Sequence, residues 1–139
     1  MVDRSLLLRK VAELDTYLGQ VRGYSGVALA EYQADWKTQR VVERTLQMMI
    51  ESCADIAHHL IADGGFRAPT SYSDAFKVLH ENGAIDDRLL PVMEKMAKFR
   101  NILVHQYESV DAEIVVLILK RHLSDFEAFR DAVLAHIRS

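Results

Sequence analysis

The sequence predicts an all-α protein, an up-and-down helical bundle of about five helices without a sheet. Apolar residues recur with the 3.6-residue spacing of amphipathic helices along almost the whole chain, and no run shows the strict alternation of a half-buried strand. Two prolines and six glycines in 139 residues leave little room for long loops. At this length we expect one domain, residues 1–139, which can bury a core without disulfides.

The N-terminal half carries the patterns of two long helices with a short one between them. Asp3 can cap the first helix, whose apolar pattern fails at residues 23–26. A short helix is predicted over residues 29–35, and a long helix runs from about residue 38 to residue 63. Gly64–Gly65 ends the long helix, because glycine readily adopts the left-handed conformation that closes many helices. The apolar faces of the two long helices include Leu7, Val11, Leu14, Leu18, Val42, Leu46, Met49, Ile50, Cys53, Ile56 and Leu60.

Two helices are predicted in the middle of the chain, after a connector that holds one of the prolines. Ser71 or Ser73 can cap the first of them, which ends at residues 82–83. The second starts within residues 86–90, where acidic residues suit the positive end of a helix. It continues into the run RNILVHQY, residues 100–107.

A last helix is predicted from about residue 112 to residue 137, with Ser109 or Asp111 as its cap. The longest apolar run, residues 114–119, is far too short to span a bilayer, so we expect no membrane association. A single cysteine, Cys53, excludes an internal disulfide and a thiolate zinc cage. We therefore expect a cytoplasmic protein.

The distribution of charge matters more than the net charge of -3, which argues against nucleic-acid binding by the whole surface. Two stretches, residues 88–105 and residues 37–44, are rich in basic residues. These residues are Arg88, Lys95, Lys98 and Arg100 against Glu94, and Lys37, Arg40 and Arg44 against Glu43. Each stretch is either a local nucleic-acid contact or a solvated helix face.

No cofactor and no metal is predicted. His58 and His59 are adjacent, so on a helix their side chains point about 100° apart and make a poor pair of metal ligands. Gly64–Gly65 lacks the preceding strand and the following lysine of a phosphate-binding loop.

The run RNILVHQY holds more polar groups than a core helix needs. On a continuous helix Asn101 and His105 are neighbours, so an amide oxygen can hold one imidazole nitrogen. Arg100 and Tyr107 would also share a face. Arg100 and His105 differ by roughly 140° around the axis and about 7.5 Å along it. The two side chains can converge on one phosphate only because the arginine side chain is long, or because the helix ends near His105.

These residue types match the three roles of RNA cleavage without a metal. A base takes the 2′-hydroxyl proton, a cation stabilises the phosphate, and an acid protonates the leaving 5′-oxygen. Histidine transfers protons near neutral pH, and arginine donates two parallel hydrogen bonds to a phosphate. One histidine cannot be base and acid in the same turnover, so a symmetric dimer with two copies of this run across one cleft is the natural interpretation. Helix capping and ion pairing remain the structural alternative.

The chain resembles the HEPN domains, and within them the HepT group of toxins. The resemblance rests on Arg100-Asn101, on the spacing Arg-x4-His-x-Tyr that continues to His105 and Tyr107, and on the surrounding helices, including residues 43–61. It implies the HEPN-like bundle and a metal-independent endoribonuclease that forms its RNA cleft as a homodimer. It also implies a partner, an MNT-type nucleotidyltransferase antitoxin, which in this family transfers AMP to the motif tyrosine, here Tyr107.

Within this resemblance Arg100 and His105 are expected to be catalytic, and Asn101 and Glu43 to support them. Candidate RNA contacts are Lys98, Arg44 and Arg40. Two other functions remain open: a non-catalytic subunit that binds nucleotides or presents a substrate to a nucleotidyltransferase, and a helical dimer that acts only in assembly. In the last case, replacing Arg100 and His105 would affect nothing beyond stability.

Overall fold

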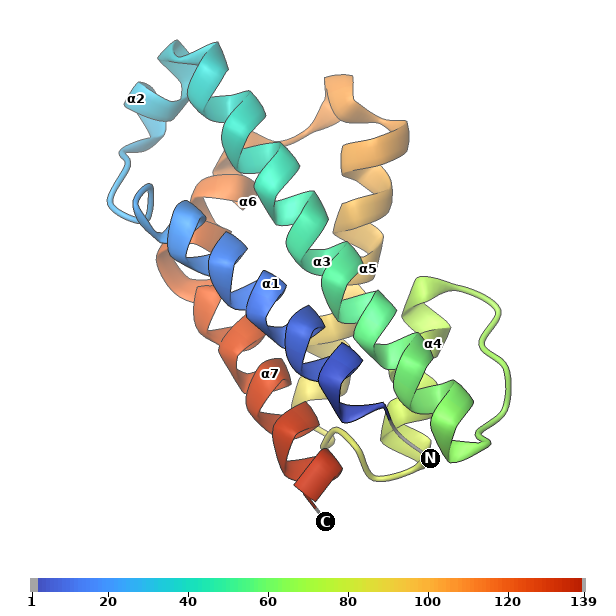
Figure 1. Cartoon of the computed structure of the whole chain (residues 1–139). Coiled ribbons are helices and arrows are strands. Elements are labelled where there is room, and N and C mark those ends of the chain that lie inside the picture. Colours follow the sequence, from blue (N-terminus) through green and yellow to red (C-terminus); the bar gives the residue numbers. More distant parts are fainter. Residues whose placement is uncertain (1–2, 139) are drawn as a thin grey trace.

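Helices account for nearly all of the chain in the computed structural model, which describes residues 3–138 (Figure 1). The all-α prediction is confirmed, and this range contains no strand. The α-helices are α1 (Arg4–Arg22), α2 (Leu29–Ala34), α3 (Trp36–Gly64), α4 (Tyr72–Glu81), α5 (Leu89–His105), α6 (Ala112–Leu117) and α7 (Leu123–Arg138). None of the described helices is long and apolar enough to cross a membrane.

Capping residues set where the helices start, and most of them are the predicted ones. Asp3, Ser71 and Asp111 each accept a backbone N–H of the following first turn, at 3.1, 3.0 and 2.9 Å. Asp35 caps α3, which therefore begins two residues earlier than predicted. At the other end of α3, Gly65 closes the helix with a positive φ of 66°.

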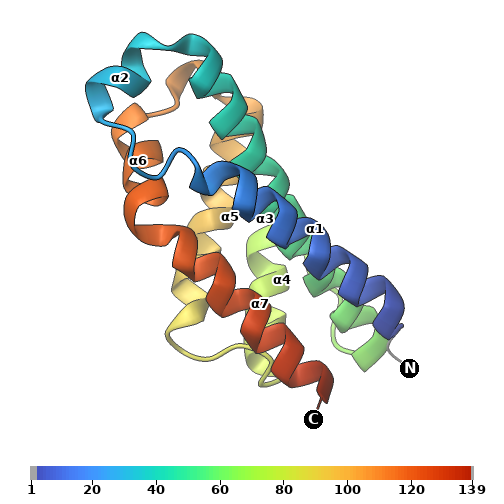
Figure 2. The same ribbon diagram turned by 60° about the vertical axis from the view of Figure 1, so that its left-hand side comes forward.

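Helix α3 is the central element of the bundle and packs against α1, α4 and α5 (Figures 1 and 2). α5 runs antiparallel to α3, and α7 lies beside α1. The core between these helices is fully apolar at its centre, where the rings of Phe76 and Phe129 meet edge to face at 5.7 Å. Burying each such side chain stabilises the fold by roughly 1.5–3 kcal/mol.

The last helix differs from the prediction of one continuous element over residues 112–137. A π-helical turn, Ile118–His122, separates α6 from α7. α6 packs against α2, whereas α7 packs against α1 and α5. The segment thus changes partners at the turn, and the wider π geometry accommodates the change in direction.

Candidate active site at the end of α5

The run RNILVHQY forms the last turn and a half of α5 and the start of the segment that follows. Leu103 is buried and anchors the run in the core, together with Phe99 one turn earlier. Asn101 and His105 are exposed on the outer side of the helix. The sequence therefore places its polar groups at a helix end that is open to solvent.

Helix α5 ends at His105. A helix end near His105 was one of the two conditions under which Arg100 and His105 could converge on one phosphate. Gln106 leaves the helical conformation, with φ −134° and ψ 41°, and Tyr107 begins a separate 3₁₀ turn. The expectation that Arg100 and Tyr107 share a helix face is therefore wrong, because the helix does not continue to Tyr107. The phenol is 63% exposed.

The amide of Asn101 contacts Arg100 and not His105. Its Oδ1 accepts a hydrogen bond from Nη1 of Arg100 at 3.3 Å. Within residues 3–138 the imidazole of His105 makes no hydrogen bond. The expected hydrogen bond with Asn101, which would select the imidazole tautomer, is therefore not present. The guanidinium next to Asn101 is charged, and a charged donor attracts an amide oxygen strongly.

Arg100 has a fixed position because two other helices hold its guanidinium. Nε and Nη2 both donate to Oε2 of Glu51 on α3, at 3.0 and 2.8 Å. The guanidinium carbon lies 4.6 Å from the ring centroid of Tyr72 on α4. Sequence reasoning missed both contacts, since 49 residues separate Arg100 from Glu51. The available signal was an acid, Glu51, between the apolar positions of a long helix.

The predicted supporting residue Glu43 lies two turns before Glu51 on α3. Its carboxylate is 3.5 Å from Arg40, and burial raises its pKa while Arg40 opposes that shift. α3 and α5 run antiparallel (Figure 1). Going from Glu51 to Glu43 along α3 therefore leads toward the same end of the bundle as going from Arg100 to His105 along α5. Its supporting role stays a prediction.

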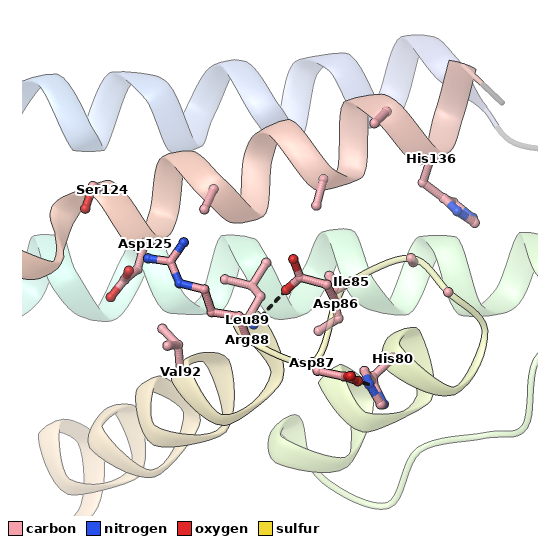
Figure 3. A pocket seen from close by; sticks show the side chains of 15 residues that line it. His80, Ile85, Asp86, Asp87, Arg88, Leu89, Val92, Ser124, Asp125 and His136 are labelled. Carbon is pink, nitrogen blue, oxygen red and sulfur yellow. Dashed lines mark hydrogen bonds and ion pairs between the residues drawn. The ribbon is translucent and has the colours of Figure 1, made fainter.

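The basic stretch of residues 88–105 is not one patch. Lys98 is exposed on α5 near Arg100, as Arg40 and Arg44 are exposed on α3, and their roles as RNA contacts stay predictions. Arg88, in contrast, lines a cavity of about 840 Å³ between the start of α5 and α7 (Figure 3). Twelve residues of helix, about 18 Å, separate Arg88 from Arg100.

A smaller groove of about 390 Å³ lies beside Arg100. Its lining includes both residues that hold the guanidinium, Glu51 and Tyr72. Tyr17 on α1 also lines this groove. The cavity of Figure 3, at the opposite end of α5, contains none of the residues predicted to be catalytic.

Sequence comparison finds relatives across nearly the whole chain. The family described as "Ribonuclease HepT-like" matches residues 14–133. An mRNA nuclease HepT of Shewanella oneidensis is 32% identical over 130 residues, which cover 94% of this chain and 97% of the relative. A tRNA nuclease HepT of Aphanizomenon flos-aquae is 24% identical over 115 residues, 81% of this chain and 77% of the relative.

Solved structures agree with this relationship. A tri-AMPylated Shewanella oneidensis HEPN toxin in complex with MNT antitoxin superimposes with a TM-score of 0.87 at 31% identity, covering 97% of this chain and 99% of the toxin. A toxin–antitoxin complex with AMP-PNP gives a TM-score of 0.88 at 30% identity, covering 95% and 99%. The chain therefore belongs to the HepT-like ribonuclease family, the HEPN-fold endoribonucleases.

Proposed function

We propose that this protein is the toxin of a toxin–antitoxin pair and cuts cytoplasmic RNA without a metal, through Arg100 and His105. The observation that carries the proposal is the end of α5, where a guanidinium held by other helices lies one and a half turns before a solvent-exposed imidazole. Relatives of similar length are nucleases that act on mRNA or tRNA.

In the proposed reaction the 2′-oxygen of a ribose attacks the adjacent phosphorus as the phosphorus–O5′ bond breaks. One histidine takes the 2′-hydroxyl proton, and a second protonates the leaving 5′-oxygen. Arg100 stabilises the charge that builds up on the phosphate oxygens. Since each chain has one His105, the site is composite, formed by two copies of the α5 end across the cleft of a homodimer.

We further propose that Tyr107 is the residue through which the toxin is silenced. Its phenol is exposed in the 3₁₀ turn that begins two residues after His105, so a partner enzyme can reach it. An AMP group there would bring a phosphate beside the positive Arg100 and occupy the space meant for the RNA phosphate. The related toxin of known structure is AMPylated and bound to an MNT antitoxin, which supports a nucleotidyltransferase as the partner here.

Cleavage of a fluorogenic single-stranded RNA in excess chelator tests the catalytic proposal. We expect Arg100→Ala and His105→Ala each to lower kcat/KM by about 10²-fold or more, since each removes a group that acts in the transition state. Lys77→Ala, an exposed change on α4, serves as the control. Unchanged cleavage in both active-site variants would mean that Arg100 and His105 are not the catalytic residues. Nucleotide binding without any RNA cleavage by the wild-type protein would instead favour the non-catalytic nucleotide-binding subunit.

Incubation with the nucleotidyltransferase and labelled ATP tests the silencing proposal. We expect Tyr107→Phe to abolish AMP incorporation and to keep RNA cleavage, because the phenol oxygen is the acceptor and has no catalytic role. Tyr72→Phe is the matched control and should incorporate AMP normally. Full incorporation in Tyr107→Phe with loss in Tyr72→Phe would make Tyr72 the acceptor.

A further inference from the structure

The Arg100 guanidinium is bound on one edge and on one face by residues from two different helices. Glu51 of α3 accepts from Nε and Nη2 through a single oxygen, Oε2. Tyr72, the first residue of α4, lies under the plane of the group with 4.6 Å between guanidinium carbon and ring centroid. Only 18% of the Arg100 side chain is exposed. A long side chain that is otherwise free to rotate is thus confined to one orientation.

Glu51 and Tyr72 are themselves held in place. The Glu51 oxygen that accepts from Arg100 also accepts from Nε2 of Gln47, one turn earlier on α3, at 3.2 Å. The Tyr72 ring meets the edge of His58 at 6.2 Å between centroids. His58 in turn is fixed through Nδ1, which lies 2.7 Å from the carbonyl oxygen of Ala54. The support for Arg100 therefore extends to further side chains of α3, the half-buried Gln47 and the exposed His58.

This arrangement leaves one edge of the guanidinium for a ligand. An arginine has five N–H donors, and Glu51 occupies Nε and one donor of Nη2. The amide oxygen of Asn101, at 3.3 Å, occupies one donor of Nη1. The remaining donors belong to Nη1 and Nη2, which are the pair that binds two oxygens of a phosphate side by side.

We propose that Glu51 and Tyr72 are positioning residues for RNA cleavage, which hold Arg100 so that its Nη1–Nη2 edge is presented to the scissile phosphate. The inference rests on the proposed function above. Donors that are already oriented need no rearrangement as charge develops, and small displacements of such groups are costly in rate. The competing interpretation is a plain ion pair that joins α3 to α5, and a partly exposed pair of this kind contributes little to stability.

The test compares kcat, KM and thermal stability of Glu51→Gln and Tyr72→Leu on the fluorogenic RNA in chelator. For Glu51→Gln we expect kcat to fall about 10- to 100-fold while KM stays within about twofold, since phosphate binding keeps the Arg100 charge. For Tyr72→Leu we expect a fall of about 2- to 30-fold. Tyr72→Phe keeps the ring and should retain the wild-type kcat.

Two further controls separate positioning from general destabilisation. Asp15→Asn breaks an ion pair of similar exposure, Asp15 with Arg130 at 2.9 Å between α1 and α7, and should leave kcat unchanged. In an Arg100→Ala background, measured in single turnover with enzyme in excess, Glu51→Gln should cause less than about a twofold further loss, because the group to be positioned is gone.

The outcomes are distinguishable. A wild-type kcat in both Glu51→Gln and Tyr72→Leu, together with a large loss in Arg100→Ala, overturns the positioning role and leaves the proposed function intact. A loss from Glu51→Gln that is as large without Arg100 as with it also overturns the positioning role. No loss in Arg100→Ala overturns the proposed function itself.

Discussion

At the scale of single residues, Arg100 and Arg67 are each held by carboxylates from other elements. Arg67, in the connector between α3 and α4, shows this as clearly as Arg100 does. It forms two forks, one with Asp74 and one with Glu81, through four hydrogen bonds of 2.8–2.9 Å. These bonds lower the pKa of Asp74 and of Glu81. They also fix the start of α4, where Tyr72 lies.

Arg67→Met should lower the melting temperature at pH 7, and the deficit should shrink in acid. Carboxylates with a lowered folded-state pKa add stability above their unfolded pKa, about 3.9 for Asp and 4.3 for Glu. That stability disappears as the pH falls from about 5 toward the folded-state values. Thermal unfolding by circular dichroism at pH 7 and pH 3 measures the change, with Arg67→Lys as the control that keeps the charge. An equal deficit at both pH values would contradict the ion-pair origin.

The same scale shows which side-chain contacts a sequence can predict. The cluster of polar residues at the end of α5 could be found from the run RNILVHQY, because the excess of polar groups lies within eight consecutive residues. The partners of Arg100 could not be predicted, because Glu51 comes from a position 49 residues away and spacing within one helix says nothing about it. The pairing of Asn101 with His105 failed for a related reason. Helical spacing gives proximity, but the competing donor on Arg100 decides where the amide points.

At the scale of elements, the ends of helices depend on a few capping residues and on backbone conformation. A glycine at a helix end and a glycine inside a helix have opposite effects. Gly65 ends α3 in the left-handed conformation, with a φ of 66°. Gly19 lies inside α1 on an exposed side, and nothing lies within 4 Å of the place where a Cβ would be. One glycine is required by the fold and the other only weakens its helix.

Gly65→Ala should therefore destabilise the protein by about 1–2 kcal/mol, the penalty of an L-residue in the left-handed region. Gly19→Ala should stabilise it by about 0.5–1 kcal/mol, because alanine favours a helix interior. Urea unfolding followed by far-UV circular dichroism gives both values, and the two variants serve as controls for each other. A shift of the same sign in both would refute the conformational explanation.

Most elements were predictable because caps and apolar periodicity are local signals. Asp3, Ser71 and Asp111 act as caps as expected, and Gly65 ends α3. The π turn at Ile118–His122 was not predictable from periodicity. It reflects a change of packing partner between α6 and α7, which depends on where α1 and α2 lie in the bundle.

At the scale of the whole molecule, the antiparallel crossing of α3 and α5 puts the predicted RNA-binding residues at one end of the bundle. Arg40 and Arg44 lie toward the start of α3, and His105 lies at the end of α5 (Figure 1). The cavity lined by Arg88 is at the other end of α5 (Figure 3). In the proposed composite site, a second copy would therefore approach the end that carries His105.

Mixed dimers test whether two copies of His105 act on one phosphate. Wild-type and His105→Ala chains are co-expressed at varied ratios, and RNA cleavage is measured per total protein after dimers are confirmed by light scattering. If one imidazole is the base and the other the acid, only wild-type homodimers are active. Activity then follows the square of the wild-type fraction, about one quarter at equal amounts, because random pairing gives that share of homodimers. Mixing with Lys77→Ala should leave activity constant. A linear dependence, about one half at equal amounts, would mean that each chain cleaves RNA with its own histidine, and the composite site would have to be abandoned.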